Sequence, residues 1–337
     1  MHRRHFLDLG LRQTTAVASA MFGASALFPV AALAQGAGAW PDKPVRWILS
    51  QPPGSGPDNI ARMLGERLAH TLGQPVVIDN KPGGQNVIGA QAASRAPADG
   101  YTFYFATTAA LVTNSFLFKS MPYDPQKDFV PVAFIGKSPF AVLVRAESPI
   151  TSIQELIARS RATPDTLSIG NEGPRTFGGI IARLLNARAA ARANLVAYSR
   201  VGEAVQNVIG GQTDAVVADV ASTGQLVRQG RLRMLAVTTG KRMAAWPQVP
   251  ALAEVIPGFD MSGWFTLVAP TGTPGTAIAR MHKEVNALLA DREMAERILT
   301  VGPVAEPLPS PDAIGQFLKD EFQRWGTAAK EIGLLAE

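Results

Sequence analysis

The apolar positions of this chain recur with two different periods, and the two periods alternate along it. Residues 45–50 (VRWILS) are a short, nearly continuous apolar run, which is typical of a buried strand. In residues 59–72 the apolar side chains recur three and four positions apart, as in an amphipathic helix. The first third of the chain thus predicts strands over 45–50, 76–79 and 101–106 and helices over 59–72 and 86–93. This order predicts a mostly parallel α/β sheet with helices on its faces.

A second set of the same units follows a proline-rich connection at residues 120–131. Its predicted strands cover 132–135, 141–144, 167–169, 196–198, 215–218 and 232–238, and its helices begin at 152, follow the loop after 169 and cover 202–209. A strand over 264–270 and a mostly helical remainder complete the chain. Two α/β units predict two lobes facing a cleft. We expect residues 35–106 with 226–337 to form the first lobe and residues 107–225 the second.

Two loops rich in glycine and proline each lead from a predicted strand into a predicted helix. The first is residues 51–58 (QPPGSGPD), and the second is residues 170–176 (GNEGPRT). Such a loop gathers backbone N–H groups at the positive end of a helix, where an anion is stabilised. Neither loop is followed by the lysine of a nucleotide-binding P-loop. The pattern therefore favours a small anion over a nucleotide.

The N-terminus predicts export. Residues 2–8 (HRRHFLD) resemble a twin-arginine signal, an apolar stretch over 14–33 follows, and residues 32–34 (ALA) form a small-x-small cleavage site. We expect removal of residues 1–34 and a periplasmic location by the twin-arginine route; the alternative is a retained membrane anchor. No later apolar stretch is long enough to span a membrane.

Composition narrows the possible chemistry. With no cysteine, the chain has no disulfide, no thiolate nucleophile and no cysteine-based metal site. His70 and His282 are the only histidines after the signal, and both fall in helical patterns without neighbouring ligands, so no metal site is predicted. The net charge of +5 is small for a nucleic-acid-binding protein. We expect no cofactor and no nucleic-acid partner.

In addition, several blocks of the chain resemble the tripartite tricarboxylate transporter receptors, the Bug family of periplasmic solute-binding proteins. The blocks occur in order: WPDKPV (40–45), PPGSGPD (52–58), LGQPVV (72–77), NKPGG (80–84), ADGY (98–101), PYDP (122–125), KDF (127–129), GGQ (210–212) with Asp214, LAVT (235–238), KR (241–242), WPQVP (246–250) and APTGTP (269–274). They extend over nearly the whole mature chain.

The resemblance implies a type II periplasmic-binding-protein fold, in which two α/β lobes joined by two crossing strands close on a ligand. It implies a receptor, not an enzyme, that captures a small carboxylate and passes it to membrane permease subunits or reports it to a sensor protein. We expect a monomer. The alternatives are an exported α/β hydrolase with Ser55 as nucleophile, and an orphan binding protein used only for signalling.

Family ligand contacts carry over to positions in four parts of this chain. They are Pro53, Gly54, Ser55 and Gly56 in the first loop, Thr107 and Thr108 at the lobe crossing, Asn171, Gly173, Arg175 and Thr176 in the second loop, and Tyr198 and Asp219 on the far wall. Arg175 is either a clamp on a distal carboxylate or a solvated residue. The chain departs from the family pattern at Ser55, at Pro57, which removes an amide donor, at Glu172 to Pro174, and at Ser199 and Arg200 after the tyrosine.

Overall fold

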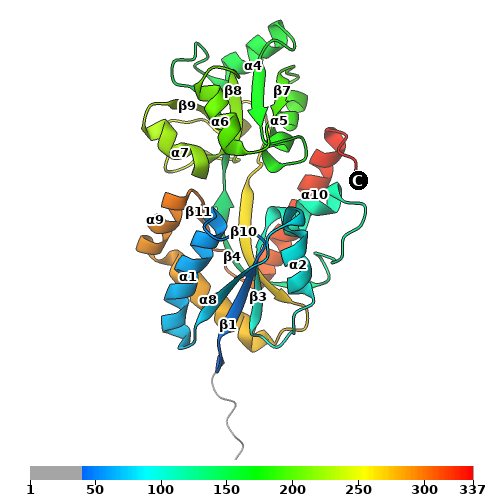
Figure 1. Ribbon diagram of the computed structural model, residues 1–337, viewed down its shortest axis with the longest axis vertical. Coiled ribbons are helices and arrows are strands. Elements are labelled where there is room, and N and C mark those ends of the chain that lie inside the picture. Colours follow the sequence, from blue (N-terminus) through cyan, green and yellow to red (C-terminus); the bar gives the residue numbers. More distant parts are fainter. Residues whose placement is uncertain (1–39, 337) are drawn as a thin grey trace, which may run out of the picture. The chain divides into compact units, whose positions relative to one another are not determined.

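The strands of residues 40–336, the part that this computed structural model describes, pair into two sheets (Figure 1). The six-stranded sheet has the order β11-β4-β10-β3-β1-β2, and the five-stranded sheet has the order β7-β6-β8-β5-β9. The predicted signal peptide, residues 1–34, lies outside the described residues.

The first sheet contains β1 (Val45–Leu49), β2 (Val76–Asn80), β3 (Thr102–Thr107), β4 (Phe129–Ser138), β10 (Gly263–Pro270) and β11 (Val304–Ala305). Its helices are α1 (Gly56–Leu72), α2 (Val87–Ser94), α3 (Asn114–Leu117), α8 (Gly275–Ala290), α9 (Arg292–Val301) and α10 (Pro311–Glu331), with a 3-10 turn at Gly84–Asn86 and a π-helical turn at Ala109–Thr113. We call residues 40–138 and 263–336 lobe 1.

The second sheet contains β5 (Phe140–Arg145), β6 (Ser168–Asn171), β7 (Asn194–Ala197), β8 (Ala215–Asp219) and β9 (Leu232–Val237). Its helices are α4 (Ile153–Ala162), α5 (Phe177–Arg188), α6 (Val201–Ile209) and α7 (Val220–Arg228), with a 3-10 turn at Leu252–Glu254. We call residues 140–262 lobe 2. No helix within residues 40–336 is both long and apolar enough to cross a membrane.

The period of two in β1 explains why helices cover both faces of its sheet. Trp47 and Leu49 belong to a buried cluster with side chains of α1, α8 and α9, whereas Ile48, between them, belongs to the cluster that includes α2 and α10. All three side chains are at most 1% exposed. A strand buried on both faces reads as a continuous apolar run rather than an alternating one.

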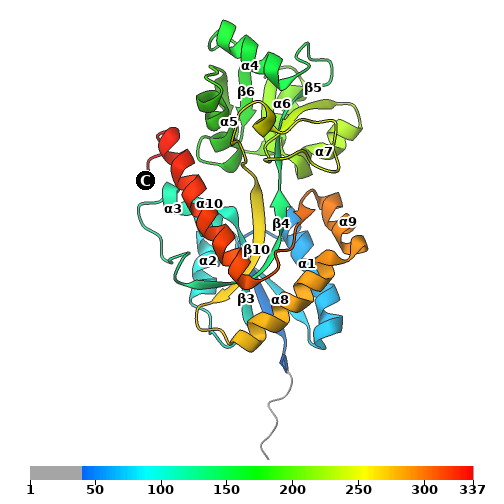
Figure 2. The same ribbon diagram turned by 180° about the vertical axis from the view of Figure 1, so that it is seen from behind.

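Two adjacent strands cross between the lobes. β4 and β10 pair antiparallel from Gly263 opposite Ser138 to Pro270 opposite Phe129, and both run through the waist of Figures 1 and 2. Only Pro139 separates β4 from β5, which lies in the second sheet. A proline has no N–H for the ladder, so it marks the point where the chain changes sheets.

The lobe boundaries therefore differ from the predicted ones. The sheets divide near residues 139 and 262, not at 107 and 226, because β4 pairs with β10 in the first sheet and β9 pairs with β5 in the second. These pairings join residues far apart in the sequence, and local periodicity does not reveal them.

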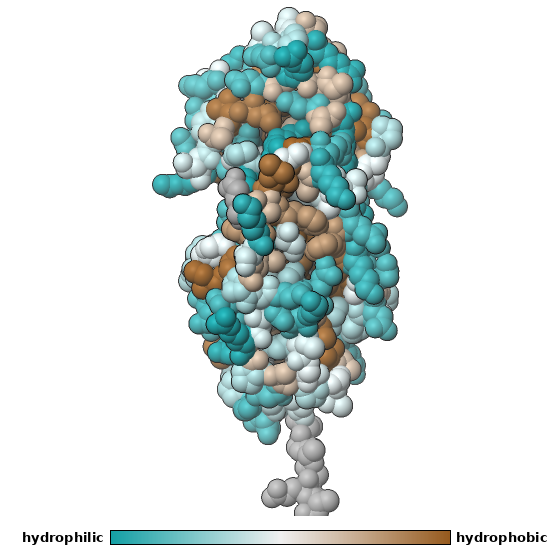
Figure 3. All heavy atoms as spheres, turned by 90° about the vertical axis from the view of Figure 1, so that its right-hand side faces the viewer, coloured by the Kyte–Doolittle hydropathy of each residue, from teal (hydrophilic) through white to brown (hydrophobic). Residues whose placement is uncertain are grey.

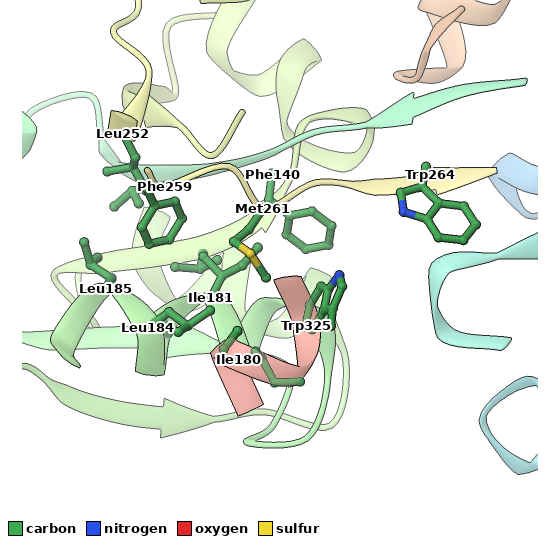
Figure 4. Packing of buried hydrophobic residues seen from close by; sticks show 14 of the residues in the cluster. Phe140, Ile180, Ile181, Leu184, Leu185, Leu252, Phe259, Met261, Trp264 and Trp325 are labelled. Atoms are coloured by element: carbon green, nitrogen blue, oxygen red, sulfur yellow. The ribbon is translucent and has the colours of Figure 1, made fainter. Parts of the chain in front are cut away.

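Helix α10 extends from lobe 1 to lobe 2, as both ribbon views show (Figures 1 and 2). Its Trp325 ring lies 5.0 Å from the Phe177 ring of α5, and Figure 4 shows Trp325 beside the apolar side chains of lobe 2. Six residues further on, Glu331 pairs with Arg188 at 3.0 Å. On the face seen in Figure 3, hydrophobic residues gather at the waist, and smaller hydrophobic groups lie among hydrophilic residues over the two lobes. The last helix thus braces the two lobes.

Candidate functional site

Asp58 organises the first glycine loop. Its side chain is 1% exposed, and it accepts hydrogen bonds from the Gly54 amide at 2.8 Å, from Arg62 Nε at 2.9 Å and from Asn80 Nδ2 at 2.8 Å. Burial raises the pKa of this carboxyl group, but the hydrogen bonds from Arg62, Gly54 and Asn80 outweigh burial and hold the pKa below its ordinary value. The carboxylate therefore fixes the loop from inside.

This arrangement leaves few amides of the loop for a ligand. The Gly54 amide is already bound to Asp58, and the Asn59 amide donates to the Ser55 carbonyl at 2.9 Å. Pro57 has no amide hydrogen. The bond from Asn59 to Ser55 is the first one of the helical type. The amides of Gly56 and Asp58 come before it, in the first turn of α1, where N–H groups have no intrahelical acceptor.

Replacement of Asp58 by asparagine is expected to lower the free energy of unfolding by about 2 kcal/mol at neutral pH, because buried donors lose a charged acceptor. The loss should be constant above the ordinary aspartate value of 3.8. It should shrink as pH falls below that value towards the lowered folded-state pKa, because the wild-type carboxylate then becomes protonated too.

Urea unfolding of both proteins at several pH values would check this. Asp320→Asn, at an exposed position of α10, is the matched control and should change stability by less than about 0.5 kcal/mol. An Asp58→Asn protein as stable as this control at neutral pH would contradict the role given to Asp58.

Thr108 and Arg175, two of the predicted ligand residues, bond to segments far away in the sequence. Thr108 Oγ1 accepts from the Trp264 amide at 2.8 Å and thereby ties the end of β3 to the crossing strand β10. The Arg175 guanidinium donates to the carbonyl of Leu335 at 3.1 Å and to that of Leu117. Arg175 thus joins lobe 2 to α3 and to the segment after α10. The clamp on a distal carboxylate stays a prediction.

The second loop is held by its own polar side chains. Asn171 Oδ1 accepts from the Gly173 amide at 2.9 Å, and the Asn171 carbonyl accepts from the Tyr198 amide at 2.8 Å. Thr176 caps α5: its Oγ1 accepts from the Gly179 amide at 3.2 Å and donates to the Gly173 carbonyl at 2.8 Å. Gly173 has a φ of +117°, a conformation that favours glycine.

A cavity of about 500 Å³ brings parts of both lobes together. Gly56 and Pro57 line it from the start of α1, and Asp219 lines it from the end of β8 in lobe 2. Phe140 and Phe265 lie in its wall, and Phe265 is the ladder partner of Thr107. Of the predicted residues, Gly56 and Asp219 thus line the same cavity from the two lobes, and Thr107 lies one strand away. Pro53 is exposed on the loop before them.

Glu172 is not among the ligand contacts predicted from the sequence. A methyl group added to Gly178 would lie 3.6 Å from both Glu172 Oε1 and Phe140 Cε1, so the carboxyl group lies close to the cavity wall. Burial raises the pKa of Glu172, the nearby charge of Asp219 raises it further, and a hydrogen bond from the Gly178 amide opposes both. The sequence signal that could have indicated this residue is the departure from the family pattern at Glu172 in the second loop.

Among the described residues, Ser55, the nucleophile of the hydrolase alternative, has no hydrogen-bonded base. Ser55 Oγ is buried, and within residues 40–336 it has no hydrogen-bond partner. His282 lies on α8 and contacts the carbonyls of Val132 and Pro309, whereas His70 is exposed near the end of α1. A serine without an adjacent base is a poor nucleophile. Arg200, which precedes α6, is exposed.

Known proteins resemble this chain over both lobes. Residues 60–334 match the sequence profile of the tripartite tricarboxylate transporter family receptor. A UPF0065 protein of Bordetella bronchiseptica is 35% identical over 302 residues, which cover 89% of this chain and 88% of that protein. A structure from R. palustris, solved with adipate, has a TM-score of 0.77 at 29% identity and covers 88% of this chain and 100% of that chain. The periplasmic binding protein BugD has a TM-score of 0.73 at 27% identity, with the same coverage.

Proposed function

Because this chain belongs to the tripartite tricarboxylate transporter receptor family, we propose that it captures a small organic carboxylate between its lobes and delivers it to a membrane transporter of that type. The family consists of periplasmic solute-binding receptors, not of enzymes. The observation that carries the proposal is the cavity lined by the start of α1 in lobe 1 and by Asp219 in lobe 2.

The start of α1 is the part of the cavity that suits a carboxylate. The amides of Gly56 and Asp58 lie at the positive end of a helix of 17 residues. A ligand carboxylate would accept a hydrogen bond from each of these two amides, which have no acceptor within the helix, and would replace the water bound there. Asp58 does not compete for the ligand, because its carboxylate is buried behind the loop and already accepts three hydrogen bonds.

Closure of the lobes would complete the site. β4 and β10 form the hinge region, and bending near residues 138–140 and 261–263 would move α7 and the second loop relative to α1. A ligand that contacts both lobes stabilises the closed state by its differential affinity for that state. The membrane partner then recognises the surface that the two lobes present in the closed state. Export by the twin-arginine route and a monomeric state belong to the same proposal.

Thermal unfolding of the mature protein with a panel of small mono-, di- and tricarboxylates tests the proposal. A ligand at 100 times its dissociation constant should stabilise the folded state by about 2.7 kcal/mol, and calorimetry on each hit should give a stoichiometry of about one. If no carboxylate shifts the transition, and ester hydrolysis appears that Ser55→Ala abolishes, the receptor function is wrong and the hydrolase alternative replaces it.

A further inference from the structure

The cavity between the lobes is acidic on its lobe 2 side. Among the described residues that line it, Asp219 is the only charged one. Both of its oxygens accept from neutral donors of one residue: Oδ1 from the Ser222 amide at 2.7 Å, and Oδ2 from Ser222 Oγ at 2.9 Å. A receptor for a dianion would be expected to offer a cation here, and this wall offers a carboxylate.

Glu172 adds a second carboxyl group beside Asp219. A β-carbon added to Gly178 would lie 3.6 Å from Glu172 Oε1 and 3.6 Å from Cε1 of Phe140, which lines the cavity, so Glu172 lies close to this lining residue. The Gly178 amide donates to the Glu172 carboxyl group. No arginine is among the described residues that line the cavity. Two arginines of lobe 2, Arg175 and Arg183, donate to carbonyls at the end of α3 and just after α10. Lys137, at the hinge, pairs with Glu306 at 3.2 Å.

Lobe 1 presents the opposite preference across the same cavity. The unpaired amides at the start of α1 favour a negative group. Ser55 Oγ, in the residue before this helix, is buried and has no partner among the described residues. One ligand that contacts both walls therefore meets donors at one end and carboxyl groups at the other.

We propose that the ligand is a zwitterion, with its carboxylate on the first turn of α1 and a primary ammonium group facing Asp219 and Glu172. This inference rests on the proposed function and specifies its substrate class. A dicarboxylate of the same length would bring a third negative charge to the lobe 2 wall, where burial strengthens repulsion. An ammonium group at that place donates to both carboxyl groups. Asp219 and Glu172 are then specificity-determining residues.

Calorimetry with pairs of ligands of equal chain length tests this proposal. The pairs are succinate with 4-aminobutanoate, glutarate with 5-aminopentanoate, and adipate with 6-aminohexanoate. In each pair that binds, the wild-type protein should bind the amino acid at least tenfold more tightly than the dicarboxylate. Asp219→Asn and Glu172→Gln keep the acceptors for Ser222 and Gly178, and each should reduce this ratio by about tenfold or reverse it.

Asp214→Asn is the matched control, because Asp214 precedes the same strand at its opposite end and bonds to Ser168 there. It removes the same charge and should leave the ratio unchanged. Tighter binding of the dicarboxylates by the wild-type protein, or a ratio that neither Asp219→Asn nor Glu172→Gln changes, would overturn the zwitterion assignment alone. If no member of any pair binds but another carboxylate of the wider panel does, this inference fails alone; if the whole panel gives no hit, the proposed function fails with it.

Discussion

Replacement of Gly179 by alanine is expected to destabilise the protein and to weaken ligand binding together. A β-carbon at this position would lie 1.7 Å from the Gly173 carbonyl oxygen and 2.6 Å from its carbon. Both atoms belong to the backbone, so no side-chain rotation relieves the overlap. The loop of residues 171–176 must move away from α5, and overpacking of this kind costs about 1–3 kcal/mol or more.

The loss of binding follows from what this loop carries. The Gly173 carbonyl and the Gly179 amide are both bound to Thr176, so displacement of the carbonyl also disturbs the cap of α5. Glu172 lies next to Gly173 and would move with it. Because the proposed ligand contacts Glu172, we expect the dissociation constant to rise at least tenfold, measured by calorimetry beside urea unfolding.

Gly202→Ala is the matched control for this substitution. Gly202 also lies in the first turn of a lobe 2 helix, α6, but no atom lies within 4 Å of the position of its added β-carbon. Alanine at such a helical position is expected to stabilise by about 0.5–1 kcal/mol. If Gly179→Ala changes stability and affinity no more than Gly202→Ala does, the close approach of Gly173 to α5 contributes neither to stability nor to ligand binding.

Much of the architecture could be predicted from local patterns. The predicted strand at 45–50 corresponds to β1, the predicted helix at 59–72 to α1, and the loop between them begins that helix. The predicted two-lobed α/β fold of periplasmic binding proteins is confirmed by the solved relatives, such as BugD. These features depend on the period of two or of 3.6 within one segment, which is visible in the sequence alone.

The lobe boundaries could not be predicted in the same way. The run of residues 132–135 indicates a strand, but the observed β4 covers Phe129–Ser138 because β10 pairs along its whole length. Likewise β9 belongs to lobe 2 because of its pairing with β5. Partner choice in a sheet depends on tertiary packing, which a single segment does not encode.

The ligand contacts show the same limit at the level of side chains. The resemblance places Arg175 and Gly54 in the two glycine-rich loops, but their hydrogen bonds depend on segments that are packed against them. Arg175 donates to the carbonyl of Leu335, near the far end of the chain. The Gly54 amide donates to the Asp58 carboxylate. In the sequence, Glu172 only interrupts the family pattern of the second loop. Its position near Asp219 follows from the pairing of β6 with β8, which the sequence does not show.

Replacement of Gly302 by alanine is expected to hold the lobes apart and lower ligand affinity at least tenfold without touching the ligand. Gly302 ends α9 in lobe 1, and its φ of +112° lies in the region that favours glycine. A β-carbon there would lie 2.1 Å from Ala221 Cβ and 2.2 Å from Ala221 Cα, at the start of α7 in lobe 2. Ala221 also lines the cavity, so the overlap is relieved where the lobes meet.

The affinity falls because closure becomes costly, since a ligand binds in proportion to the population of the closed state. Gly230→Ala separates this effect from backbone strain: Gly230 also has a positive φ, +68°, but no atom lies within 4 Å of its added β-carbon. Both variants should lose about 1 kcal/mol of stability. Only Gly302→Ala should show a larger radius of gyration by small-angle scattering and a raised dissociation constant. Equal affinities for the two variants would mean that this contact between α9 and α7 does not control closure.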